Sequence, residues 1–241
     1  MKGMDTHSYD VGWEERWDDM KRFGPYSRHV RRWIHRLISP LDFVSVLDAG
    51  CGQGELLKEI QEFYPRVQRV AGIDFSLASV NITRQRIGAG RFEVIDLQTQ
   101  RLDEKYDLTL SVDVMEHIPD DEAALTNLRQ MTSKYALVSS IQGNFLPQWE
   151  ADVVGHVRNY RRGELASKMK RAGFVVDRVV EWGFPFYSPL YRWILTRMSG
   201  QGTDGDYGLR RRLLAQALYG GFLLNSSRRG DLILVLAHIE A

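Results

Sequence analysis

Three alternate glycines follow an apolar strand at residues 46–54, which read Val-Leu-Asp-Ala-Gly-Cys-Gly-Gln-Gly. The strand is predicted over 43–47, and a helix is predicted to begin near Glu55. Glycine lacks a Cβ, so a turn with glycine at positions 50, 52 and 54 can close tightly and let its backbone approach a ligand. A strand, a glycine-rich turn and a helix in this order are typical of nucleotide sites. We therefore expect a nucleotide-type cofactor at this turn.

The rest of the chain alternates strands with helices. Apolar runs predict six more strands, over residues 69–73, 92–95, 106–112, 135–139, 174–181 and 231–238, with helices between most of them. Two amphipathic helices precede the first strand, and Pro40 ends the second of them. This order predicts an α/β fold with a doubly wound, mostly parallel seven-stranded sheet and helices on both faces. We expect an N-terminal helical cap over 1–40, a main domain over 41–241, and within it a helical insert or lid over about 182–230, before the last strand.

Length and charge favour a single α/β domain that binds a small molecule. The chain has 241 residues, and its 32 Lys and Arg nearly balance its 31 Asp and Glu, so the overall charge calls for no nucleic acid. Cys51 is the one cysteine, so no intramolecular disulfide can form, and no N-terminal run resembles a signal peptide. No apolar stretch is long enough to span a bilayer. We expect a cytoplasmic monomer or homodimer with no nucleic-acid partner and no integral membrane segment.

The glycine spacing disfavours a nicotinamide cofactor, because dinucleotide turns leave two residues before the last glycine and this turn leaves one. Three further motifs follow in order: Gly-Ile-Asp-Phe-Ser at 72–76, Phe-Glu-Val-Ile-Asp-Leu at 92–97 and Tyr-Asp-Leu-Thr-Leu-Ser-Val-Asp-Val-Met-Glu-His-Ile at 106–118. Through these four motifs, over roughly residues 40–181, the chain resembles the class I S-adenosylmethionine-dependent methyltransferases. The resemblance implies a Rossmann-like fold, S-adenosylmethionine as cofactor, S-adenosylhomocysteine as product, and a methyltransferase domain over 41–241.

The expected cofactor residues lie at the ends of successive strands. Asp74 ends the second strand, where an acid can accept hydrogen bonds from both ribose hydroxyls. The resemblance implies that Asp96 accepts from the adenine amino group, that the Leu97 N–H meets a ring nitrogen and that Phe75 packs on the adenine. It also implies that Asp48 and the amides of the glycine turn orient the methionyl end. The full expected set is Asp48, Ala49, Gly50, Gly52, Gly54, Asp74, Phe75, Asp96, Leu97, Val112 and Asp113.

Two histidines are candidate catalytic bases. The sulfonium already makes the methyl group electrophilic, so the protein must align the acceptor and, for a hydroxyl, remove its proton. Histidine suits that task near neutral pH. His117 follows the fourth strand, and His156 lies in a polar stretch beyond the fifth. The alternatives are that His117 forms structural hydrogen bonds beneath the cofactor and that His156 is an ordinary loop residue.

A metal site is a further alternative. Asp113, Glu116 and His117 form an Asp-x-x-Glu-His arrangement. It is similar to the Glu-x-x-Glu-His of the ubiquinone-type O-methyltransferases, where the resemblance implies a divalent cation. Two carboxylates and an imidazole could hold Mg²⁺. The same stretch also occurs in relatives that use no metal, so we expect no Mg²⁺ requirement.

Two features that are absent from the sequence narrow the range of possible methyl acceptors. No Asn/Asp-Pro-Pro-aromatic motif follows the fourth strand, which disfavours methylation of an exocyclic base amine. Cys51 lies inside the cofactor turn, where it cannot be the attacking thiolate that C5-cytosine methylation needs. We expect a small aromatic or lipid-like metabolite, with oxygen favoured over nitrogen as the acceptor.

The insert is expected to face the substrate. Aromatic residues are dense over 182–195, which suits the wall of an apolar pocket, a shallow peripheral contact with lipid, or plain core packing. Arginines at 210–212 and 228–229 are either a solvated face or a site for an anionic group. Expected substrate contacts are Tyr160, Trp182, Phe186 and Tyr187. The resemblance also places Tyr9, Trp13, Trp17, Tyr26 and Arg28 in a cap that closes over the cofactor.

Three other functions stay open at this point. A cofactor-binding module without catalysis could act as a partner subunit. An RNA methyltransferase could use the arginine-rich insert, although the balanced overall charge disfavours it. A dehydrogenase is the most distant alternative.

Overall fold

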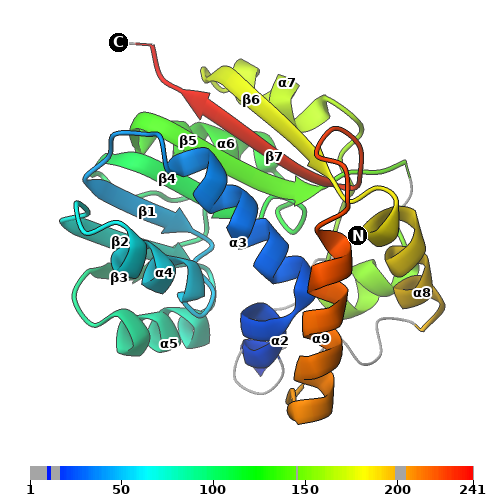
Figure 1. The fold of residues 1–241 in the computed structure, drawn as a ribbon. Coiled ribbons are helices and arrows are strands. Elements are labelled where there is room, and N and C mark those ends of the chain that lie inside the picture. Colours follow the sequence, from blue (N-terminus) through cyan, green and yellow to red (C-terminus); the bar gives the residue numbers. More distant parts are fainter. Residues whose placement is uncertain (1–9, 12–16, 145, 199–204, 241) are drawn as a thin grey trace.

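Seven strands form one sheet in the order β3-β2-β1-β4-β5-β7-β6 (Figure 1). The computed structural model describes residues 10–11, 17–144, 146–198 and 205–240. The strands are β1 (Ser45–Ala49), β2 (Arg69–Asp74), β3 (Arg91–Val94), β4 (Tyr106–Val112), β5 (Thr132–Ile141), β6 (Val175–Trp182) and β7 (Leu232–His238). Neighbours from β3 to β5 pair in parallel, whereas β7 runs antiparallel to both β5 and β6. The predicted doubly wound, mostly parallel sheet is confirmed.

Helices cover both faces of this sheet (Figure 1). The helical elements are α2 (Asp18–Phe23), α3 (Pro25–Ile38), α4 (Glu55–Phe63), α5 (Leu77–Ile87), α6 (Asp121–Gln130), η1 (Glu150–Val154), α7 (Glu164–Arg171), η2 (Phe186–Tyr191), α8 (Arg192–Arg197) and α9 (Leu209–Phe222). One core joins α3, α4 and part of α5 to one face, and a second core joins α6 and α7 to the other. Alternate residues of each strand enter opposite cores, as Val46 and Leu47 do, because side chains alternate along a strand.

The strand order reverses between β1 and β4, which lie side by side at the centre of the sheet. From β1 the chain proceeds outward through β2 and β3, and then returns to β4 on the other side of β1. The carboxyl ends of strands at such a reversal open into a crevice that is not covered by a crossover. The fold therefore places its crevice at the ends of β1 and β4.

The glycine turn lies at this crevice. β1 is two residues further along the chain than predicted, because Asp48 and Ala49 still pair with β2. Gly50, Gly52 and Gly54 have φ angles of 94°, 51° and 78°, a region that favours glycine. A Cβ on Gly50 would also lie 2.1 Å from Val114 Cγ2, so the turn packs against the loop that follows β4. The conformational role predicted for these glycines is confirmed.

The N-terminal helices and the insert pack against each other beside the sheet. Helix α9 lies alongside α3, and the buried His29 ring stacks between Tyr219 of α9 and Trp182 at the end of β6, with centroid distances of 4.3 and 4.6 Å (Figure 1). Burial lowers the pKa of His29 to about 4, so it stays neutral there. The division of the chain at residue 40 stays a prediction. None of the helices in the described ranges is both long enough and apolar enough to cross a bilayer.

Candidate functional site

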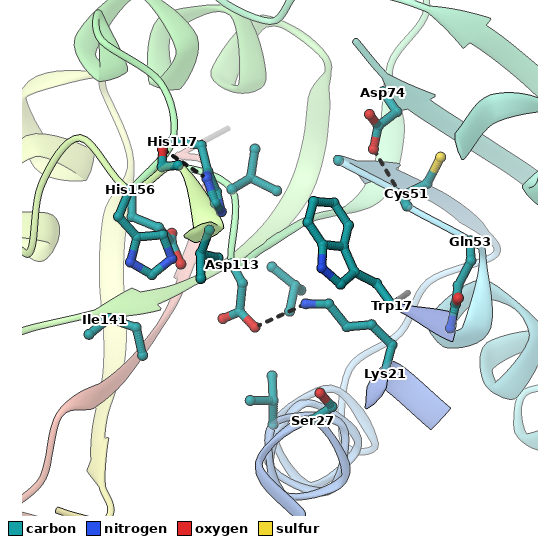
Figure 2. A pocket seen from close by; sticks show the side chains of 18 of the residues that line it. Trp17, Lys21, Ser27, Cys51, Gln53, Asp74, Asp113, His117, Ile141 and His156 are labelled. Carbon is teal, nitrogen blue, oxygen red and sulfur yellow. Dashed lines mark hydrogen bonds and ion pairs between the residues drawn. The ribbon is translucent and has the colours of Figure 1, made fainter. Parts of the chain in front are cut away.

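A cavity of about 770 Å³ lies at the carboxyl ends of β1, β2 and β4. The glycine turn lines one side of it, α2 and the start of α3 line a second, and η1, η2 and Leu195 of α8 line a third. Figure 2 shows Asp74 and Cys51 on one side, His117 and His156 on the other, and the indole of Trp17 between them. The cavity therefore has two halves, one built on the glycine turn and one built on the histidines.

Asp74 organises the half built on the glycine turn. Its Oδ2 accepts the N–H of Gly52 and its Oδ1 accepts the N–H of Ser76, each at 3.0 Å. The Ser76 hydroxyl in turn accepts the N–H of Ser79 at 3.1 Å and caps α5. A carboxylate has more acceptor positions than these two bonds use, so Asp74 can still accept from a ribose hydroxyl.

Asp48 lies next to Asp74 and has no hydrogen-bond partner for its buried Oδ1 among the described residues. Burial, together with the charge of Asp74, raises the pKa of Asp48 to about 8. Burial also raises the pKa of Asp74 to about 6. An unpaired buried carboxylate at a cavity wall suits a cationic group on a ligand, and the ammonium group of an amino acid is such a group.

Most other residues expected to bind the cofactor lie around the same half. Gly50, Gly52, Phe75, Asp96, Leu97, Val112 and Asp113 all line the cavity. Ala49 and Gly54 do not. Ala49 is buried in the core beneath the turn, and a Cβ on Gly54 would meet Thr83 of α5 at 3.0 Å, so Gly54 serves the packing of the turn on that helix.

Cys51 also lines the cavity as a free, buried thiol. Burial and the two neighbouring carboxylates raise its pKa well above the usual range. The thiol therefore stays protonated and is not a nucleophile at neutral pH.

Asp113 is held by three side chains at the boundary between the two halves. Its Oδ1 accepts hydrogen bonds from Tyr26 at 3.1 Å and from Ser139 at 3.3 Å, and Lys21 Nζ lies 3.7 Å from its Oδ2. Its φ of 55° is unusual for a residue with a side chain. Both carboxylate oxygens of Asp113 therefore already have partners, two in the N-terminal helices and one in β5.

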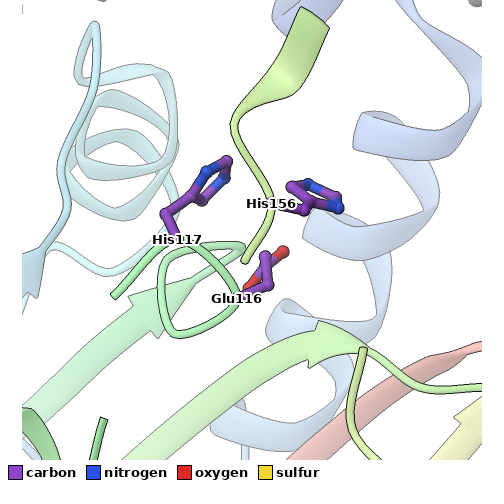
Figure 3. A group of neighbouring side chains, drawn as sticks. All are labelled: Glu116, His117 and His156. Carbon is purple, nitrogen blue, oxygen red and sulfur yellow. The ribbon is translucent and has the colours of Figure 1, made fainter. Parts of the chain in front are cut away.

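The second half of the cavity is built around Glu116, His117 and His156 (Figure 3). The first two lie in the loop after β4, and His156 comes from the segment after η1, so two loops converge here. The two imidazole rings meet edge to face with centroids 4.8 Å apart. The structure thus groups His156, and not Asp113, with Glu116 and His117.

Burial sets the protonation of this group. It lowers the pKa of His117 well below the usual range, so the ring is neutral near pH 7. Nδ1 of His117 lies 3.3 Å from the carbonyl oxygen of Gly155, and because a carbonyl only accepts, Nδ1 carries the proton. Burial and Asp113 raise the pKa of Glu116 to about 7, and its Oε2 accepts from Ser140 at 2.7 Å.

The same three side chains could hold a metal ion. One donor atom from each lies within 4.8 Å of the other two. Two imidazoles and one carboxylate suit a transition metal such as zinc better than Mg²⁺, which prefers oxygen ligands and water. The Asp113, Glu116 and His117 set considered for Mg²⁺ is a different set, because Asp113 already has the three partners described above.

A buried ion pair between Glu150 and Arg192 lies next to His156. Glu150 of η1 accepts three hydrogen bonds, of 2.7 to 3.1 Å, from the guanidinium of Arg192 in α8. Arg192 also bonds Asp231 at 2.9 Å. Nδ1 of His156 lies 3.6 Å from Glu150 Oε2, and its backbone N–H donates to the Glu150 carbonyl at 3.0 Å. Neither Glu150 nor Arg192 was predicted, because the pair joins residues that are distant in the sequence.

Of the four expected substrate contacts, only Tyr187 lines the cavity. Tyr160 is fully buried away from it, with its hydroxyl donating to Asp121 at 2.6 Å. Trp182 is fully buried against His29 and Tyr187, and Phe186 is 40% exposed outside the cavity. The wall is completed by residues that were not among these four, which are Trp149, Tyr191, Leu195 and Tyr207.

Two of the residues expected in the N-terminal cap lie at the cavity. Trp17 and Tyr26 line the cavity, whereas Arg28 faces α9, where it bonds Gln216 at 2.8 Å and lies over the ring of Tyr219. Tyr9 and Trp13 lie outside the described residues. The N-terminal segment therefore contributes to both the cavity and the contact with the insert.

A family model described as a methyltransferase domain matches residues 19–179. The chain belongs to this methyltransferase family. The matched range contains the glycine turn, Asp74, Asp96 and the histidines, so the family assignment and the cavity concern the same part of the molecule. The domain is a class I S-adenosylmethionine-dependent methyltransferase domain. That Asp48 and Asp74 bind the cationic and ribose groups of this cofactor stays a prediction.

The methyltransferase is similar to several known proteins. It is 26% identical over 115 residues to a malonyl-[acyl-carrier protein] O-methyltransferase of Bacillus anthracis, covering 44% of this chain and 42% of that protein. It is 26% identical over 140 residues to a ubiquinone biosynthesis O-methyltransferase of Leptothrix cholodnii, covering 53% and 58%. The chain spans about half the length of these curated relatives. The structure of magnesium protoporphyrin IX methyltransferase from Synechocystis with bound S-adenosylhomocysteine shares the fold, with a TM-score of 0.56, 16% identity and coverage of 90% and 84%.

Replacing Asp74 with Asn should weaken binding of S-adenosylhomocysteine by about 2 kcal/mol, roughly 30-fold in Kd, because a charge-assisted acceptor is lost. Asp74→Ala should weaken it further, since the bonds to Gly52 and Ser76 are lost as well. Titration calorimetry measures both. Asp177→Asn, on the exposed edge strand, is the matched control. Unchanged affinity in both Asp74 variants would contradict the ribose assignment.

Cofactor affinity should rise with pH because of Asp48. Its raised pKa means that it is largely protonated below about 8, and a carboxyl that must ionise to pair with an ammonium group costs binding energy. Kd should therefore fall as pH rises from 6 to 8, by at most about tenfold per unit for one proton. Calorimetry in buffers of different ionisation enthalpy should detect proton release. Asp48→Asn should remove this dependence, and a flat profile in the unaltered protein would refute the pairing.

Proposed function

We propose that this methyltransferase transfers the methyl group of S-adenosylmethionine to an oxygen atom of a small aromatic or lipid-like metabolite. The observation that carries the proposal is the pair of imidazoles, His117 and His156, in the half of the cavity away from the glycine turn. A hydroxyl has a high pKa and needs a base to become a good nucleophile, whereas a neutral amine does not. Nitrogen is therefore the less favoured acceptor.

His117 is the proposed base. Its Nδ1 proton is held by the Gly155 carbonyl, so the lone pair of the neutral ring is on Nε2. A neutral, partly buried imidazole at a cavity wall can accept the proton that an acceptor hydroxyl loses. The two relatives described above are both named O-methyltransferases, which also supports an oxygen acceptor.

His156 and Glu116 are the proposed partners of the base. When His117 takes up a proton, a partly buried positive charge is formed, and the nearby carboxylate of Glu116 lowers the cost of that charge. His156 lies beside both groups and is backed by the Glu150 and Arg192 ion pair, which limits the positions its ring can take. In this proposal His117, His156 and Glu116 act together when His117 accepts the proton.

The remaining task is to align the acceptor and exclude water. The cofactor supplies an electrophilic methyl group, and the reaction needs the acceptor oxygen in line with the bond that breaks. Tyr187, Tyr191 and Leu195 offer flat and apolar surfaces on which a ring or an acyl chain can pack. An acceptor of that class is therefore the one the cavity favours.

Replacing His117 with Ala should lower kcat for methyl transfer by about 10²-fold or more, the usual contribution of a general base, with the affinity for S-adenosylhomocysteine little changed. His156→Ala should have a smaller effect. His238→Ala, which removes an exposed histidine paired with Asp177, is the matched control. Normal turnover in His117→Ala would refute the base assignment.

Chelation distinguishes the base from a metal centre formed by the same three residues. If the histidines act as bases, turnover after dialysis against a strong chelator should be unchanged. Loss of turnover on chelation, restored by zinc but not by Mg²⁺, would replace the proposal with a metal site.

Methyl-labelled cofactor incubated with a fractionated extract of the source cell should label a small organic molecule. Mass spectrometry of the labelled fraction should then locate the new methyl group on oxygen. Label in RNA would support the RNA methyltransferase alternative. Label in no fraction, together with normal cofactor binding, would support the partner-subunit alternative and refute the proposed activity.

A further inference from the structure

Helix α9 has an apolar stripe on the side that faces away from the protein. Its buried residues, Ala215 and Phe222, lie on one side and pack toward α3 and η2. Leu209 and Leu213, four residues apart and so on a common face, are 75% and 62% exposed. Leu224, in the turn after the helix, is 74% exposed. This is the reverse of the usual pattern, in which the outer face of a surface helix is polar.

The neighbouring elements of the insert add to this surface. Of the fifteen large apolar side chains that are exposed in the described ranges, ten lie between residues 186 and 224. They are Phe186, Leu190, Trp193, Ile194, Met198, Leu209, Leu213, Leu214, Leu223 and Leu224. Such a concentration on one segment marks a surface that is covered in use, because scattered single exposures are the norm elsewhere. We call these ten side chains the insert surface.

The charge of the segment is as uneven as its hydrophobicity. Residues 183–230 contain seven arginines and two aspartates and have no lysine or glutamate, which is a net charge of +5. The whole chain has a net charge of +1, so the other residues together carry −4. Arg192 is used in the buried ion pairs, but Arg197, Arg210, Arg228 and Arg229 are exposed in the same segment of the chain.

Exposed leucines and a tryptophan flanked by arginines are the composition of helices that lie in the interface of an anionic membrane. A second copy of the chain fits less well, because two such surfaces would bring like charges together. A nucleic acid fits less well too, because it offers nothing apolar to cover the leucines. The charge and the apolar side chains together therefore favour anionic lipid as the occupant.

The insert surface is also continuous with the wall of the cavity. Trp193 and Ile194 are exposed on α8, whereas Leu195, the next residue, lines the cavity together with Tyr187 and Tyr191. One short segment therefore faces the cavity on its inner side and the surroundings on its outer side. A membrane seated on the insert surface would lie one layer of side chains away from the cavity.

We propose that the insert surface, formed by η2, α8, α9 and the turn after it, docks the protein on an anionic lipid membrane. The arginines bind the headgroups, and the leucines and Trp193 enter the boundary between headgroups and acyl chains. The docking is peripheral and reversible. The docking does not depend on the identity of the methyl acceptor. It can therefore be tested independently of the proposed activity.

Vesicle co-sedimentation tests this docking. The full chain should sediment with vesicles of equimolar phosphatidylglycerol and phosphatidylcholine, and much less with vesicles of phosphatidylcholine alone. Raising the salt concentration from about 0.1 M to 1 M shortens the screening length from about 10 Å to 3 Å and should weaken the binding. Absence of sedimentation with anionic vesicles, or equal binding to both kinds of vesicle, would overturn the proposal.

Paired variants test which side chains are responsible. The double variant Leu209→Asp and Leu213→Asp should reduce the vesicle-bound fraction about tenfold or more, since two apolar side chains can no longer enter the membrane. Arg210→Gln combined with Arg229→Gln should mainly reduce the preference for phosphatidylglycerol. Leu77→Asp is the matched control, because Leu77 is 56% exposed on α5, away from the insert. All variants should melt at the temperature of the unaltered protein, because these side chains are exposed.

The control experiments also identify other occupants. If the leucine double variant keeps its vesicle binding, the insert surface is not the docking site and the proposal fails. If the unaltered chain ignores vesicles but forms a dimer that the leucine variant lacks, the surface is an interface between copies. If it binds RNA or an acidic protein through the arginines and ignores vesicles, the occupant is that macromolecule and the membrane is excluded.

Discussion

The hydrogen bonds of Asp74 are the constraint on which the cavity depends. One carboxylate accepts the N–H of Gly52 in the turn after β1 and the N–H of Ser76 at the start of α5. The Thr83 hydroxyl, about two helical turns further along α5, donates to the Gly52 carbonyl at 2.7 Å. The glycine turn is thus held through both the N–H and the carbonyl of Gly52. The Asp74 side chain alone sets the distance between this turn and the end of β2. The other walls of the cavity are positioned around this joint.

The local parts of this arrangement could be predicted from the sequence, because they depend on short-range rules. The alternation of apolar runs predicts the sheet, and Ser76 is a recognisable cap for the helix that follows it. The acids at the ends of successive strands meet at one edge because parallel strands share that edge. Nine of the eleven residues expected to contact the cofactor line the cavity, and Ala49 and Gly54 differ because the turn packs them inward.

The acceptor half could be predicted only in part, because its residues are brought together from distant parts of the chain. Tyr160 stands in a polar stretch next to a candidate base, yet its hydroxyl bonds Asp121, 39 residues away, in the core. Trp182 belongs to the aromatic stretch that was expected to face the substrate, and instead it packs on His29 of α3. The hydrophobic pattern of the sequence does not predict which helix will pack on a given aromatic side chain. His156 joins Glu116 for the same kind of reason, since two loops meet only in the folded chain.

The ion pair between Arg192 and Glu150 has a mechanical consequence for the insert. The start of α8 is fastened to η1 by a bidentate contact and to the beginning of β7 by Asp231, with both side chains of the main pair largely hidden from water. Moving this part of the insert outward would leave a buried charge without its counter-charge, which costs about 3–5 kcal/mol in other proteins. We therefore expect the base of the insert to behave as a fixed wall rather than as a swinging lid. If the base of the insert stays in place, we expect a bulky acceptor to enter and leave through rotation of the side chains that line the cavity, so the exchange rate would depend on these side chains more than on the cavity volume.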